Sequence, residues 1–197
     1  MIAMRAQEAL PRLILPLGLG ALLLAAYGLD LGASLSYRRD AVLDGRYWLL
    51  LSGQFVHIDL AHVSLNAAGL ILIWLLWSEQ LRTFNGMFIG IWSALSVAFA
   101  LLLIHPQIVG YAGFSGVLHG LAAGGALLGL RRQPRFNALF LVLLAAKLGW
   151  ELWGSAPSPH AFDVIVEAHA WGAGGGVIAA TMLLTCRRRT ASGLAGC

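Results

Sequence analysis

Four polar side chains, Ser115, His169, His62 and Asn66, lie within long apolar stretches of the sequence. Polar groups inside a membrane are costly, so such residues are functional candidates by default. A serine hydroxyl becomes an effective nucleophile when a base within hydrogen-bond reach takes its proton, and histidine suits that role near neutral pH. His62 and Asn66 are four residues apart, so on a helix they share one face and could donate hydrogen bonds to an oxyanion. The sequence therefore predicts Ser115 as a nucleophile and His169 as its general base.

The remaining polar residues near these positions allow more than one interpretation. His119 follows Ser115 by four residues and is a rival base, but we favour a histidine that packs on or hydrogen-bonds His169 and tunes it. Lys147 and Glu151 are also four residues apart, and we expect an ion pair between them, with a gating role as the alternative. No residue in the pattern supplies an acidic third member. The expected catalytic unit is a Ser–His dyad.

Glycines recur at every fourth position beside both members of this pair. Small residues at that spacing let two helix backbones approach closely, so two helices should meet along a glycine seam with Ser115 and His169 beside it. Gly113 and Gly116 flank Ser115 and are expected to support it, since the unpaired N–H groups of a helix that opens there favour negative charge. The seam glycines are Gly116, Gly120 and Gly124 on one helix and Gly172 and Gly176 on the other.

The amino-acid composition indicates what kind of structure positions these candidate residues. Of the 197 residues, 59% are hydrophobic and 11% are charged. In a typical soluble domain about 45–50% of the residues are apolar and about 25% are charged. This composition excludes a soluble globular protein, a disordered chain and a nucleic-acid-binding arm. Since a span needs roughly 20 apolar residues, we predict an all-α polytopic membrane protein in which residues 1–197 form a single domain. Its six transmembrane helices should lie near 13–33, 58–78, 86–105, 114–130, 136–153 and 164–186.

The arginines predict how these helices are oriented. With the N-terminus inside, nine arginines fall on the inner side and three, Arg38, Arg39 and Arg46, on the outer side. Positive residues are retained in the cytoplasm, so both termini should be cytoplasmic, including a short tail at about 187–197. The long loop at about 34–57 should then be outside. The second, fourth and sixth helices all place their polar candidates near the outer leaflet, which predicts one site at that depth.

Three motifs resemble those of the rhomboid family of intramembrane serine proteases. Gly113-Phe114-Ser115-Gly116 is similar to the family's GxSG motif, and Ala168-His169 with Gly172 and Gly176 is similar to its AHxxGxxxG motif. His57, His62 and Asn66 match the spacing of the polar residues in its second helix. The resemblance implies a rhomboid-like bundle with Ser115 as nucleophile and His169 as base. His62, Asn66 and the Ser115 backbone N–H would form the oxyanion hole. The fifth helix and the loop before the sixth would line the substrate's entry route, and neither a metal nor an organic cofactor is implied.

The sequence departs from the typical family pattern at two places, and the second of them is similar to one subgroup of the family. The long loop carries Arg46-Tyr47-Trp48 where typical members have a Trp-Arg pair, which leaves the anchoring of the loop open. His119 stands where bacterial members often have a tyrosine that stacks on the catalytic histidine. The compact length and the GxSGxLHG form are similar to rhombosortases, a subgroup associated with proteins that end in a Gly-Gly motif, one transmembrane helix and a basic tail. The implied location is a bacterial-type inner membrane, with the active site facing outward.

Other functions remain as alternatives. A catalytically inactive relative would only bind client transmembrane helices, although inactive relatives usually lack the serine or the histidine. The six histidines would also suit axial haem ligation, which a Soret absorption band would reveal. The expected partners are a membrane-anchored protein substrate and the lipid bilayer, and not nucleic acid.

Overall fold

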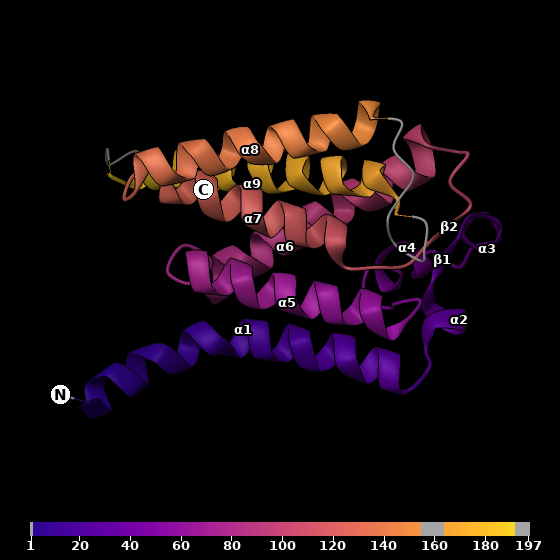
Figure 1. The fold of residues 1–197 in the computed structure, drawn as a ribbon, viewed down its shortest axis with the longest axis horizontal. Helices are drawn as coiled ribbons and strands as arrows, with labels where there is room; N and C mark the ends of the chain where they lie inside the picture. The colour runs from indigo at the N-terminus through magenta and orange to yellow at the C-terminus, as the bar shows by residue number, and fades with distance from the viewer. Residues whose placement is uncertain (1, 155–163, 192–197) are drawn as a thin grey trace.

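The computed structural model describes residues 2–154 and 164–191, with side chains over 13–154 and 164–187. Each of the six predicted segments forms a helix, and together they make a bundle (Figure 1). The helices are α1 (Ile2–Gly28), α5 (Leu60–Trp77), α6 (Thr83–Phe99), α7 (Ser115–Gly129), α8 (Pro134–Trp153) and α9 (Val166–Ala191). A short π-helix, η1 (Ala100–Ile104), continues α6. The six helices are therefore confirmed as helices.

Among the described residues, three helical segments are long and apolar enough to cross a membrane: Leu60–Trp77, Thr83–Ile104 (α6 continued by η1) and Pro134–Trp153. The helix α7 has 15 residues, which corresponds to roughly 22 Å at about 1.5 Å per residue. The structure thus supports a membrane protein, while six spans remain a prediction.

Local sequence explains where several helices begin and end. α5 begins after Asp59, whose side chain accepts a hydrogen bond from the backbone N–H of His62 at 2.7 Å. Pro134 opens α8, where a missing N–H costs nothing. The first predicted segment extends to residue 33, but α1 ends at Gly28, and Asp30 follows with a φ of 51°. At the other end of the chain α9 continues to Ala191, into the segment predicted as a tail, and residues 192–197 lie outside the described part.

The segment before α5 is folded rather than extended. It contains α2 (Gly32–Leu35), α3 (Arg39–Leu43), α4 (Leu49–Ser52) and a short strand, β1 (Tyr37–Arg38). This strand pairs antiparallel with β2 (Gly110–Tyr111), which the sequence did not predict. Arg39 anchors the segment, since its guanidinium donates to the carbonyl oxygens of Leu101 and Leu102 at 3.1 and 2.9 Å. The departure from the Trp-Arg pattern is thus accompanied by a different anchor.

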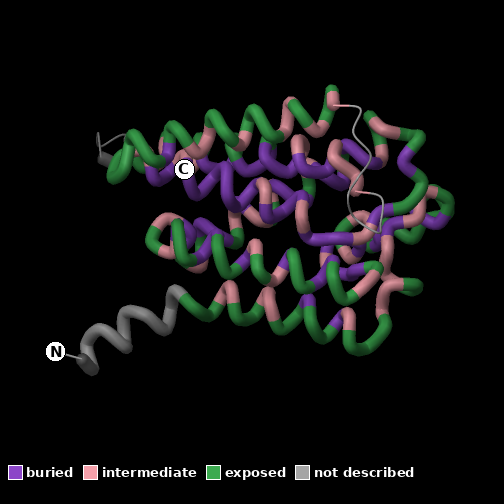
Figure 2. Tube along the Cα trace, viewed as in Figure 1, coloured by how far each residue is buried: buried purple, intermediate pink, exposed green. Residues whose placement is uncertain are grey.

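Helix α7 forms the centre of the bundle, whereas α8 lies at its edge. Nearly all of α7 is buried, while α8 is largely exposed and Asn137 is its one buried residue (Figure 2). The N-termini of α5, α7 and α9 all lie at the end of the bundle that carries β1 and β2 (Figure 1). The first turns of these three helices therefore lie at the same end of the bundle, and the side of the membrane that this end faces stays a prediction.

Candidate active site

Ser115 and His169 lie within hydrogen-bond distance of each other. Ser115 is the first residue of α7, and His169 lies in the first turn of α9. The Oγ atom of Ser115 is 3.0 Å from Nε2 of His169, and His169 is only 5% exposed. This is the geometry that a serine and its general base require. The structure thus brings together the two residues predicted to react.

The glycine seam makes this approach possible. A Cβ atom on Gly172 would overlap the carbonyl oxygen of Gly116, and one on Gly176 would overlap that of Gly120. A Cβ on Gly116 would lie 2.8 Å from the carbonyl oxygen of Ala168, the residue before His169. The backbones of α7 and α9 are therefore in direct contact, and the predicted seam is confirmed.

His62 and Asn66 lie beside the serine on the first turns of α5. Both are buried, and both line a cavity that also includes Ser115 and His169. The imidazole of His62 packs against Gly113, where a Cβ would lie 2.7 Å from Nε2. Gly113 also has a φ of +139°, a conformation that side chains rarely adopt. Glycine is thus needed at position 113 both for the turn into α7 and for the contact with His62.

Two cavities meet at Ser115 and His62. One, of about 510 Å³, runs between α5 and α8 and is lined mainly by apolar side chains, among them Leu72, Leu76 and Phe140. The other, of about 640 Å³, opens at the β1–β2 end and is more polar, with Ser36 and Arg38 in its lining. The hydroxyl of Ser115 can therefore be approached by an apolar segment from one side and by water from the other.

Glu151 was not predicted as a partner of the histidine, yet its Oε2 lies 3.1 Å from Nδ1 of His169. The expectation of a site without an acidic third member is thus wrong as a description of the geometry. The predicted ion pair of Lys147 with Glu151 is confirmed at 2.7 Å. The i,i+4 spacing predicts the ion pair. Whether the pair faces His169 or the outside of the bundle is set by the packing of α8 on α7 and α9.

His119 stacks on His169, as the favoured interpretation predicts. The two ring centroids are 4.1 Å apart and the ring planes differ by 16°. Both ring nitrogens of His119 have other partners, since Nδ1 is 2.7 Å from the carbonyl oxygen of Ser115 and Nε2 is 2.9 Å from Nζ of Lys147. This arrangement disfavours His119 as the base for the Ser115 hydroxyl.

The ligand atoms of His119, Glu151 and His169 lie within 4.8 Å of one another, so the same side chains could hold a metal ion. Two histidines and a carboxylate are a common zinc-binding set. In this structure, however, the ammonium of Lys147 already supplies positive charge to His119 and Glu151. The Nε2 atom of His169 also faces Ser115. The residues therefore fit a hydrogen-bonded network better than a metal centre.

Two buried side chains near the site, Tyr111 and His57, have shifted pKa values. Burial raises the pKa of the Tyr111 phenol, whose hydroxyl lies close to Gly116 and Ser115, so this group stays neutral. Burial, together with the neighbouring His62, lowers the pKa of His57 to about 4. The rings of His57 and His62 meet edge to face with centroids 4.9 Å apart. His57 is thus a neutral packing partner of His62 near neutral pH.

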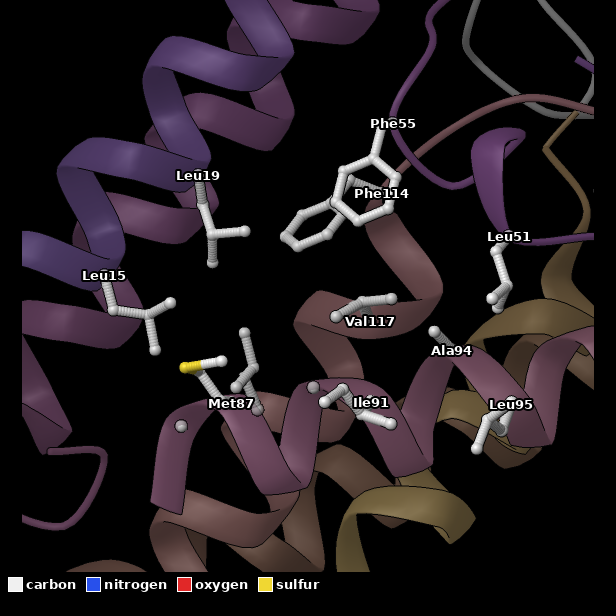
Figure 3. A pocket seen from close by; sticks show the side chains of 13 residues that line it. Leu15, Leu19, Leu51, Phe55, Met87, Ile91, Ala94, Leu95, Phe114 and Val117 are labelled. Atoms are coloured by element: carbon white, nitrogen blue, oxygen red, sulfur yellow. The ribbon is translucent and has the colours of Figure 1, made fainter. Parts of the chain in front are cut away.

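A third cavity, of about 270 Å³, lies between α1, α4, α6 and α7 (Figure 3). Its lining side chains are apolar, including Leu15, Leu19, Met87 and Ile91, with the rings of Phe55 and Phe114 facing one another at its edge. No side chain that lines this cavity can transfer a proton or act as a nucleophile. The reactive groups gather at the junction of the other two cavities.

Comparison with known proteins shows the family of this chain. The Rhomboid domain model matches residues 44–186. The chain belongs to the rhomboid family. Rhomboid proteins are in general intramembrane serine proteases that act on membrane protein substrates. The matched region of this rhomboid protein contains Ser115, His169, His62, Asn66 and Glu151. No curated protein matches the chain in sequence.

Proposed function

We propose that this rhomboid protein is an intramembrane serine endopeptidase that cleaves a membrane-anchored protein near the outer face of the membrane. The observation that carries the proposal is the 3.0 Å contact between Ser115 Oγ and His169 Nε2 at the junction of the two cavities. A helical substrate segment would enter along the apolar groove between α5 and α8. Water would reach the serine from the polar cavity at the β1–β2 end.

The chemistry follows from the positions of these groups. His169 Nε2 takes the proton from the Ser115 hydroxyl as Oγ attacks the carbonyl carbon of the scissile peptide bond. The negative charge on the former carbonyl oxygen is stabilised by His62, Asn66 and the backbone N–H of Ser115. The imidazolium then gives its proton to the leaving amine, and an acyl-enzyme remains. Water, deprotonated by His169, attacks the ester, and the carboxylic acid product is released with Ser115 regenerated.

The proposal extends to topology and substrate. The chain would cross a bacterial-type inner membrane six times, with both termini in the cytoplasm. The substrate would carry a C-terminal Gly-Gly motif, a transmembrane helix and a basic end, as in rhombosortase systems. The stacked His119, in the position where other bacterial members often have tyrosine, supports the subgroup assignment. Glycines at the cut site would help, because a helix must unwind there to expose its backbone.

The test is co-expression with a reporter that ends in a Gly-Gly motif, a transmembrane helix and a basic tail. We expect wild type to cleave it, and Ser115→Ala and His169→Ala to lose cleavage while still accumulating in the membrane. A reporter with leucines in place of the glycines should be cut more slowly. If wild type cuts neither reporter, a fluorophosphonate probe separates two cases. Labelling of Ser115 would keep the peptidase and reject this substrate, and no labelling would favour a client-binding protein without activity.

A further inference from the structure

We propose that Glu151 is the positioning residue of this site, and that Lys147 holds it in place. This inference rests on the proposed peptidase function, because it assigns a role toward the same base, His169. It converts the expected dyad into a serine–histidine–glutamate arrangement supported by a lysine. Three contacts carry it: His169 Nδ1 to Glu151 Oε2 at 3.1 Å, Lys147 Nζ to Glu151 Oε1 at 2.7 Å, and Lys147 Nζ to His119 Nε2 at 2.9 Å.

The position of the proton on His169 decides whether this residue can act as a base. A neutral imidazole carries one proton, and it can act as base toward Ser115 only when Nε2 is free of it. A carboxylate at Nδ1 accepts a hydrogen bond and therefore favours the form with the proton on Nδ1. Glu151 Oε2 is placed to accept that bond. Without this carboxylate, part of the histidine population would carry its proton on Nε2 and could not react.

Glu151 also lies next to the positive charge that develops on His169. When His169 takes the serine proton it becomes an imidazolium in a largely buried position, since the residue is 5% exposed. A carboxylate in hydrogen-bond contact stabilises that cation as it forms, as in serine proteases with an aspartate. The stacked ring of His119 is neutral in the arrangement described here and does not supply this charge. Glu151 thus stabilises the charged state of the base in addition to orienting it.

Lys147 holds Glu151 in its position beside His169. A carboxylate among apolar helices needs a partner, and Lys147, one turn earlier on α8, donates to its other oxygen. The same ammonium donates to Nε2 of His119, so the proton of His119 lies on Nδ1 and is donated to the Ser115 carbonyl oxygen. Each hydrogen bond in the network then joins one N–H or O–H to its own acceptor atom. Lys147 therefore fixes both Glu151 and the ring stacked on the base.

The experiment measures the rate at which a fluorophosphonate labels Ser115 in the purified full-length protein, together with kcat and KM on the reporter. Glu151→Gln keeps the size of the side chain but removes its charge, and its amide group can donate to Nδ1 and favour the unproductive proton position. We expect labelling and kcat to fall by about 10²-fold or more, with KM changed less than about threefold. Glu151→Asp should recover part of the rate. Lys147→Met should lower both rates by about tenfold.

Controls separate this inference from the proposed function and from misfolding. Glu79→Gln makes the same chemical change at the opposite end of the bundle, where Glu79 pairs with Arg132, and should label at the wild-type rate. Thermal unfolding identifies a variant that loses rate because it loses structure. A wild-type labelling rate in folded Glu151→Gln would overturn the inference and leave the dyad intact. Labelling that persists in Ser115→Ala would instead contradict the proposed function.

Discussion

Replacing Gly116 by alanine tests whether the glycine seam sets the distance between the serine and its base. The added methyl group would lie 2.8 Å from the carbonyl oxygen of Ala168 and 2.9 Å from Cγ2 of Val97. Ordinary contacts for a Cβ begin at 3.4 Å, so α9 must move from α7 by about 0.6 Å if the backbones yield. A direct displacement of that size would stretch the Ser115–His169 contact from 3.0 Å to about 3.6 Å, beyond hydrogen-bond range.

The substitution should lower both the stability and the rate of the chemistry. Overpacking of this kind costs about 1–3 kcal/mol, whereas a misplacement approaching 1 Å costs about 10²-fold in rate. We expect the fluorophosphonate labelling rate of folded Gly116→Ala to fall by about 10- to 100-fold. Gly174→Ala is the control, because nothing lies within 4 Å of the methyl group that it adds to α9, the helix that packs on Gly116. Wild-type labelling by folded Gly116→Ala would refute the claim that the seam sets the reactive distance.

Three further predictions concern stability, pH and metals. Asn137→Leu removes the acceptor of the buried Trp77 indole N–H, at 2.8 Å, and should lower the free energy of unfolding by about 1–3 kcal/mol, seen as a lower melting temperature. Because burial lowers the pKa of His57 from 6.5 to about 4, the unfolded chain binds the proton first as the pH falls. Stability should therefore be full above about pH 6.5 and decline toward pH 4, by up to about 3 kcal/mol, and His57→Asn should remove that part of the decline in thermal unfolding. A chelator such as EDTA should leave reporter cleavage unchanged, whereas a loss restored by zinc would show that His119, Glu151 and His169 bind a metal.

The helices were predictable because apolar length and helical periodicity are local properties. The convergence of Ser115 and His169 was also predictable. Both helices have glycines at every fourth residue, and this spacing indicates that the two helices pack closely against each other. The pairing of β1 with β2 was not, because a strand of two residues has no recognisable periodicity. The π-helical turn that receives Arg39 likewise depends on contacts between distant segments.

Glu151 shows where local reasoning stops. The spacing of Lys147 and Glu151 reveals an ion pair on one helix face, and the structure confirms it. Whether that face turns toward lipid or toward His169 depends on the rotation of α8 about its own axis. Helix α8 offers little information on this point, because only Asn137 is buried along it. The rotation of α8 about its axis is fixed by a few contacts with other helices, and these contacts cannot be predicted from a single sequence.

These contacts also link the edge helix to the reactive pair. Along the described part of α8, Asn137 near its beginning bonds Trp77 of α5, and Glu151 near its end contacts His169 of α9. The apolar groove between α5 and α8 lies between these two attachments and includes Phe140 and Leu144. A substrate helix that enters there must pack against the same helix that carries Glu151. The contact of Glu151 with His169 depends on the position of the final turn of α8. A displacement of that turn would separate the carboxylate from His169. A displacement of α8 that leaves its final turn in place would keep His169 oriented.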